Sequence, residues 1–214
     1  MSGKFSTCFF ERYAQISLAT LVGKEFDCLV NKDRPDLQSE DGWSIGIEVT
    51  RAMEESRVAE QELLKDMAGI TKGRSDMETD QILRYGYSYG LGKGHYVGTK
   101  ELLYWQMALP MRRIIESKVD KCGNGFYGEF KKMGLFIFSK DDLDEQDAVK
   151  TMHYTISLQK FQSIKYNRLY LADVNDLFVC NLEDGLQESS RMLRYLITRE
   201  QRESFYLEAV GELE

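Results

Sequence analysis

The sequence predicts a mixed α/β fold in which a helix and three strands precede a helical insertion, followed by a second helix and further strands. Three observations predict this class. Strand-like alternation and tight-turn residues occupy residues 25–50. An uninterrupted apolar run of strand length lies at Gly134–Phe138. Segments free of glycine and internal proline with dense apolar residues, at 8–22 and 110–122, have the length and spacing of helices.

The amino-terminal elements follow from local pattern. The segment from Cys8 to Val22 predicts a helix that ends near Gly23. Within it, Glu11 lies in line with the apolar stripe, which is unusual for a charge that faces solvent. Turn-like residues at 31–33 and a hairpin signal at 39–42 then separate extended segments. We therefore expect three strands, at residues 26–30, 36–38 and 43–50.

The later elements are predicted in the same way. Pro110 suits the first position of a helix, because the missing N–H has no helical partner there. Residues 147–166 indicate a helix, although 153–158 would also fit a strand. In chain order we expect helices at 51–68 and 77–83, an irregular loop rich in glycine and tyrosine at 85–100, a helix at 110–122, strands at 134–138, 168–172 and 177–181, and a charged helical tail.

Length and composition predict a single domain spanning 1–214, with the insertion at about 52–106. The 214 residues, 43% hydrophobic and 29% charged, are typical of globular proteins. No run of about 18 apolar residues is present, so we expect a cytoplasmic protein without a membrane segment. The cysteines form no CxxC pair, which predicts reduced and mostly buried thiols and makes a zinc site improbable. A homodimer stays open.

Charge is distributed unevenly along the chain. The net charge of −7 argues against a general nucleic-acid coat protein. The segment 93–132, however, contains eight Lys or Arg residues against four Asp or Glu residues. This asymmetry permits a basic groove on an acidic body.

Two carboxylates stand out on the expected strands. Asp36 follows Pro35 on the second strand, and Glu48 interrupts the buried-looking third strand, Trp43–Thr50. A hairpin between these strands brings the two carboxylates together at one end of the sheet. A charge inside an apolar strand is costly unless it is paired, so Glu48 is the stronger candidate. Asp36 alone would also fit a turn, since Pro-Asp is a common turn sequence.

The chain resembles the PD-(D/E)XK superfamily in its Pro-Asp pair, in the later Glu-x-x tripeptide and in the order of its elements. The fold of this superfamily is called restriction-endonuclease-like and has an αβββαβ core. The resemblance covers roughly residues 8–50 and 107–139. It implies that Asp36 and Glu48 bind magnesium or manganese, with the backbone carbonyl of Val49 and the carboxylate of Glu11 as further ligands. Carboxylates, waters and a phosphate suit such hard cations. The implied activity is hydrolysis of DNA phosphodiester bonds.

The sequence departs from the family at the motif lysine, where Thr50 stands. Some members of the superfamily carry this lysine on the helix that follows the insertion. Lys118 is the matching candidate, because it lies in the apolar stripe of that helix, with its neighbour Lys121 as the alternate. Arg51 ranks third, since it points to the opposite face of the strand.

Two other readings stay open. One is a nuclease-like domain without catalysis that binds nucleic acid or protein, which the loss of the lysine at Thr50 favours. The other is an α/β protein outside the superfamily. Gln162 and Tyr166 resemble a Gln-x-x-x-Tyr motif of RecB-like nucleases, but they fall one helix late and we interpret them as coincidence. The loop at 85–100 would suit base stacking or a solvated surface.

Overall fold

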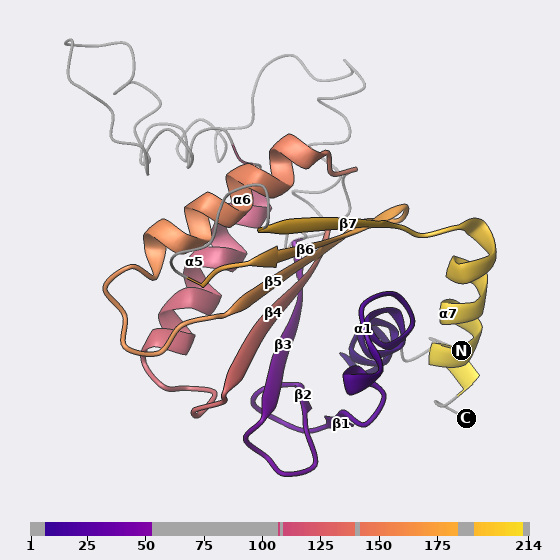
Figure 1. Cartoon of the computed structure of the whole chain (residues 1–214), viewed down its shortest axis with the longest axis horizontal. Helices are drawn as coiled ribbons and strands as arrows, with labels where there is room; N and C mark the ends of the chain where they lie inside the picture. Colours follow the sequence, from indigo (N-terminus) through magenta and orange to yellow (C-terminus); the bar gives the residue numbers. More distant parts are fainter. Residues whose placement is uncertain (1–6, 53–106, 108, 140–141, 184–190, 212–214) are drawn as a thin grey trace, which may run out of the picture.

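The computed structural model describes residues 7–52, 107, 109–139, 142–183 and 191–211. Within these residues, one seven-stranded sheet carries α-helices on both faces (Figure 1), which confirms the mixed α/β class. The strands are β1 (Val30–Asn31), β2 (Leu37–Gln38), β3 (Ile45–Ala52), β4 (Lys132–Ser139), β5 (Arg168–Ala172), β6 (Asp176–Asn181) and β7 (Met192–Leu196). The helices are α1 (Thr7–Leu21), α5 (Leu109–Gly123), α6 (Glu145–Leu158) and α7 (Arg199–Gly211), with a 3-10 turn η1 (Lys24–Phe26).

The strands lie in the sheet in the same order as in the chain. β3 and β4 pair in parallel, as do β4 and β5, whereas the other neighbouring pairs are antiparallel. A parallel pair needs a connection that crosses a face of the sheet. α5 leads into β4 and α6 leads into β5, and both helices cover the same face (Figure 1). α1 and α7 cover the opposite face.

Alternating side chains on the central strands build a core on each face. On β4, Leu135 and Ile137 pack on the side of α5 and α6, while Phe136 packs on the side of α1 and α7. β5 repeats the pattern with Leu169 and Tyr170. All five side chains are buried. Burial on both faces is the reason why β4 has a continuous apolar sequence rather than an alternating one.

Local signals decide where the crossover helices begin. Pro110 occupies the first turn of α5, as expected. α6 begins after Asp144, whose carboxylate accepts a hydrogen bond of 2.8 Å from the backbone N–H of Asp147. The Asp147 carboxylate accepts one in return from the Asp144 N–H, so the two residues form a capping box.

Two of the expected element boundaries near the amino terminus are wrong. Phe26 belongs to η1, and the first strand begins only at Val30. The cause is the side-chain amide of Gln15 in α1, which donates to the carbonyls of residues 26, 27 and 29 and holds them away from a sheet. Arg51 and Ala52 continue β3 instead of starting a helix, because Ala52 completes the buried face of that strand.

Two boundaries near the carboxyl terminus are also wrong. α6 ends at Leu158 rather than near Tyr166, because the Gln159 side chain donates to the Tyr166 carbonyl and accepts from its N–H, which closes a loop. The alternative strand at 153–158 is helical. The tail expected to be helical begins with β7, which pairs with β6 before α7 starts.

Three further expectations from the sequence concern the insertion, a membrane segment and the cysteines. Apart from Ala52, the insertion at about 52–106 lies outside the described residues, and so do its two expected helices and its Gly- and Tyr-rich loop. Among the helices that the structure describes, none is long and apolar enough to cross a membrane. Cys122 and Cys180 are buried and Cys28 is exposed, which agrees with the expectation of mostly buried thiols among the described residues.

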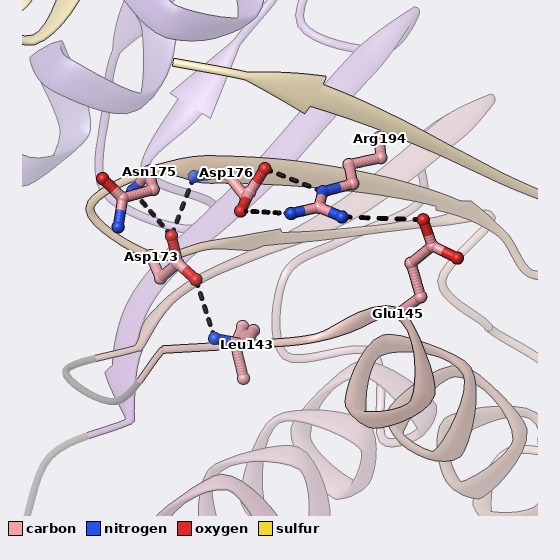
Figure 2. Close-up of polar contacts among 6 residues, drawn as sticks. All are labelled: Leu143, Glu145, Asp173, Asn175, Asp176 and Arg194. Carbon is pink, nitrogen blue, oxygen red and sulfur yellow. Dashed lines mark hydrogen bonds and ion pairs between the residues drawn. The ribbon is translucent and has the colours of Figure 1, made fainter. Parts of the chain in front are cut away.

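A polar network fixes the end of the sheet next to α6 (Figure 2). The Asp173 carboxylate, which follows β5, accepts hydrogen bonds from the backbone N–H groups of Leu143, Asn175 and Asp176, at 2.7, 2.7 and 2.8 Å. Arg194 of β7 binds the Asp176 carboxylate with two nitrogens, at 2.8 and 2.9 Å. The network therefore ties the β5–β6 turn both to the segment that enters α6 and to the edge strand β7.

Replacing Asp173 with alanine should lower the free energy of unfolding by about 2–3 kcal/mol, because three N–H groups lose a charged acceptor. Asp173→Asn should lose less, since the amide oxygen still accepts. Glu203→Gln is the control: it breaks an exposed ion pair with Arg199 and should cost about 0.3–0.5 kcal/mol. Urea unfolding measures all three. A loss for Asp173→Ala no larger than the control would contradict this account.

Candidate functional site

The β2–β3 hairpin brings Asp36 beside Glu48. β2 and β3 pair antiparallel with Leu37 opposite Ile47, and Asp36 and Glu48 are the next residues on either side of this pair. The Asp36 carboxylate accepts a hydrogen bond of 2.7 Å from the backbone N–H of Val49. The first carboxylate is thus fastened directly to the strand that carries the second.

The turn between β2 and β3 fixes this register. The Asp41 carboxylate accepts hydrogen bonds from the Ser39 hydroxyl, at 2.6 Å, from the Ser44 hydroxyl, and from the backbone N–H groups of Ser44 and Trp43, at 2.9 and 3.0 Å. These bonds hold the pKa of Asp41 well below its usual range, because they stabilise the ionised form. Gly42 follows with a φ of 71°, which glycine adopts without steric cost.

Glu48 points toward α5 and meets Lys118 there. Its neighbours Ile47 and Val49 pack on the α1 side, so the Glu48 side chain lies on the opposite face. The Lys118 ammonium is 2.5 Å from the Glu48 carboxylate, and the two side chains are 15% and 9% exposed. A carboxylate this deep is costly without a partner, and Lys118 supplies the positive charge.

Asp36 is short of such compensation. Burial, followed by the negative charge of Glu48, raises the pKa of Asp36 to about 7, and Glu11 adds a smaller effect in the same direction. The N–H of Val49 and the charge of Lys118 act in the opposite direction without cancelling the rise. Near neutral pH, a proton and another cation would therefore compete for the Asp36 carboxyl group.

Glu11 approaches the same cluster from α1. It is buried, in line with the buried residues Ala14 and Leu18, and the side-chain amide of Asn31 donates a hydrogen bond to its carboxylate. Burial raises the pKa of Glu11; the Asn31 hydrogen bond opposes the rise and the charge of Glu48 adds to it. The three acidic side chains predicted as ligands thus lie within electrostatic range of one another.

Tyr127 belongs to the site and was missed by sequence reasoning. It lies after α5 and is 4% exposed, and its hydroxyl lies near Glu48 and Tyr166 without a hydrogen bond of normal geometry to the described residues. Burial and then the charge of Glu48 raise its pKa, so the hydroxyl is a neutral donor close to that carboxylate. A single tyrosine in a Gly-rich turn carries no motif. The only signal was its position shortly after the helix that carries Lys118.

Tyr166 also contacts this region. Its hydroxyl donates to the backbone carbonyl of Lys118 at 3.2 Å, and its ring lies 6.5 Å from that of Tyr127, centroid to centroid. The Gln162 side-chain oxygen is buried without a hydrogen-bond partner among the described residues. The Gln-x-x-x-Tyr pair that we interpreted as coincidence therefore places its tyrosine on the turn of α5 that bears Lys118.

The other candidate cations lie away from the carboxylates. The Arg51 guanidinium sits over the Phe10 ring of α1, 4.6 Å from its centroid, on the face predicted for it. Lys121 is exposed, with its ammonium 5.4 Å from the centroid of the Phe126 ring. Of the three cations considered in place of the motif lysine, Lys118 is the one that contacts Glu48.

The donor set suits a hard divalent cation. Asp36 and Glu48 offer carboxylate oxygens and Val49 offers a backbone carbonyl, all of the type that magnesium and manganese prefer. In the described part of the chain, no three His, Cys, Asp or Glu side chains are grouped closely enough to hold a metal ion. A cation here would therefore rely on two carboxylates and complete its shell with water, which magnesium commonly does. Its charge would also offset the repulsion that raises the pKa of Asp36.

Asp36 should titrate with a midpoint near 7, as followed by carboxyl-carbon NMR. Because this pKa lies above the ordinary value of 3.8, the folded protein binds the proton more tightly than the unfolded chain. The Asp36 contribution to stability should then decrease as the pH rises from about 4 to about 7. Lys118→Met should raise the midpoint further and Lys121→Met should leave it unchanged. A wild-type midpoint near 4 would contradict this electrostatic picture.

Tyr127→Phe should leave the free energy of unfolding unchanged or raise it, because the buried hydroxyl lies near Glu48 and Tyr166 but forms no hydrogen bond of normal geometry with the described residues. Tyr166→Phe is the matched control and should cost about 1 kcal/mol, since it removes the hydrogen bond to Lys118. Urea unfolding without added metal compares the two variants. Equal losses in both would show that the Tyr127 hydroxyl is bonded within the fold.

Compared with protein-family models, with curated proteins and with solved structures, the chain gives no significant match. The case for a function therefore rests on the side chains of this site.

Proposed function

We propose that this chain is a metal-dependent nuclease of the PD-(D/E)XK type that hydrolyses phosphodiester bonds of DNA. One observation carries the proposal: Asp36 and Glu48 from adjacent strands and Lys118 from α5 converge at one edge of the sheet. The order of the described elements supports it, since a helix, three strands, a helix and a strand also form the core of that superfamily.

Each residue has a chemical role in this proposal. Asp36, Glu48 and the carbonyl of Val49 would hold magnesium or manganese, and Glu11 would take part through water. When bound, the cation would polarise the phosphodiester and lower the pKa of the attacking water. Asp36 is held in place by the Val49 N–H, so the carboxylate needs little reorganisation to accept a ligand.

Lys118 takes over the role of the lysine that the strand lacks at Thr50. Its ammonium orients Glu48 through the 2.5 Å contact and keeps a positive charge at the place where a phosphate would meet the carboxylates. In a partly buried setting such a charge stabilises the negative charge that builds up on the phosphate oxygens in the transition state. The neutral Tyr127 hydroxyl, close to Glu48, would donate to a water or a phosphate oxygen.

A second candidate is a nuclease-like domain that binds nucleic acid without cleaving it. Thr50 in place of the motif lysine favours it, and so does the lack of a third side-chain ligand among the described residues. In this case Lys118 would be a structural counter-ion for Glu48. Metal binding and turnover separate the two candidates.

Asp36→Asn and Glu48→Gln should each abolish binding of Mn²⁺ in calorimetric titration, because each removes one of two carboxylate ligands. Lys118→Met should leave the metal affinity nearly unchanged and lower the rate of DNA cleavage about 100-fold or more. Thr50→Ala and Lys121→Met are the controls and should cost much less in turnover.

The outcomes discriminate between the candidates. Unchanged Mn²⁺ binding in both carboxylate variants would remove the metal site. Wild-type metal binding with no cleavage of single- or double-stranded DNA would favour the binding module. Equal turnover of Lys118→Met and Lys121→Met would remove the catalytic role of Lys118.

A further inference from the structure

An exposed aromatic ring with two cations lies beside the candidate site. Phe126, in the segment that joins α5 to β4, is 45% exposed. The Arg34 guanidinium lies 4.8 Å and the Lys121 ammonium 5.4 Å from the centroid of its ring, and both of these side chains are exposed. The Tyr127 ring meets Phe126 edge-on, with centroids 5.3 Å apart, and supports it from the buried side.

The three residues come from the segments that build the candidate site. Arg34 lies two residues before Asp36, in the connection between β1 and β2. Lys121 follows Lys118 by three residues, so the two lie on neighbouring positions of one face of α5. Phe126 precedes Tyr127, whose hydroxyl is close to Glu48. The β1–β2 connection and the end of α5 lie at the same end of the sheet (Figure 1).

We infer that Arg34, Lys121 and Phe126 form a binding site for an unpaired nucleotide of a nucleic-acid strand. The ring offers a face on which a base can stack, and the two cations can move from the ring to the phosphates on either side of that base. In a duplex both faces of each base are already stacked within the helix. The ring therefore adds affinity for single-stranded or frayed segments and little for a closed duplex.

The charges in and around this site attract nucleic acid only weakly, so the site selects for unpaired nucleotides and does not bind every strand strongly. Arg34 lies 3.5 Å from Asp33, but both side chains are largely exposed, and such a pair exchanges partners at little cost. The whole protein carries a net charge of −7, which repels nucleic acid at long range. Two phosphate contacts give a slope of about −1.4 in log affinity against log salt, at about 0.7 per phosphate of a single strand.

The inference rests on the nucleic-acid part of the proposed function and not on cleavage. The test measures fluorescence anisotropy of a short labelled single strand, and of a blunt duplex of the same sequence, with the full chain in EDTA. The single strand should bind more tightly. Phe126→Leu should weaken single-strand binding about tenfold, because a stacked base is lost, and should leave duplex binding nearly unchanged.

Two further variants test the cations without touching the ring. Arg34→Gly removes the guanidinium at a backbone position with a φ of 74°, which glycine adopts without strain. Lys121→Gln removes the ammonium. Each should reduce the salt slope by about 0.7. These variants decide the question if Phe126→Leu does not fold, which its melting temperature reveals.

Matched controls lie on α7, which covers the opposite face of the sheet (Figure 1). Tyr206 is also 45% exposed, so Tyr206→Leu removes an aromatic ring of equal exposure, and Arg199→Gln removes an exposed cation. Equal affinity for single strand and duplex would overturn the inference, as would equal effects of Phe126→Leu and Tyr206→Leu. Ring-dependent single-strand binding without Mg²⁺-dependent cleavage would support this site and reject the nuclease. Mg²⁺-dependent cleavage together with single-strand binding that does not depend on the ring would support the nuclease and reject this site.

Discussion

The buried charge of Glu48 is the constraint on which the candidate site depends. β3 is covered on both faces, so a carboxylate in its centre is tolerated only where a cation can reach it. Lys118 does so from α5, which fixes how that helix lies across the strand. The field of Glu48 extends further along the helix: burial and then this charge raise the pKa of Cys122 to about 12. The Tyr166 hydroxyl in turn holds the backbone of Lys118. The charge of Glu48 thus links the hairpin to α5, and the Tyr166 hydroxyl links α5 to the α6–β5 connection.

The origin of the positive charge matters less than its position. Coulombic stabilisation depends on distance and burial, not on which element carries the charge. Lys118 reaches Glu48 from α5, the helix that packs over this face of β3, and the helix holds the lysine in position. Among the described residues of the cluster, Asp36 and Glu48 share the charge of Lys118, and Glu11 adds a third carboxylate nearby, so negative charge is left over. In the proposed function, this surplus of negative charge would attract a metal ion, and the exposed Arg34 and Lys121 would attract a phosphate to an adjoining position.

The predictable parts of the molecule were those with local causes. β4 and β5 were found because their apolar runs are buried on both faces, and the hairpin because Asp41 and Gly42 mark its turn. Glu48 and Lys118 were selected through the family resemblance, supported by the fact that each interrupts an apolar pattern. What escaped depends on distant partners. Gln15 of α1 holds the chain at Phe26 out of the sheet, and the edge strand β7 is stabilised by pairing with β6 and by Arg194. The burial of the Tyr127 hydroxyl likewise exists only after α5 has packed.

The order of the strands has a consequence for how the protein folds. Each strand that the structure describes pairs with the next described strand in the chain, so none of them has to insert between two that have already formed. β3 and β4 are an exception because they are far apart in the sequence: β3 ends at Ala52 and β4 begins at Lys132. Closing an unfolded chain segment of about 80 residues costs about 4 kcal/mol in chain entropy. Pairings this far apart in sequence form slowly. Glu48 precedes this segment and Lys118 lies within it on α5. The amino-terminal hairpin and the carboxyl-terminal strands can therefore each form early, while the site itself is assembled only when α5 docks on β3.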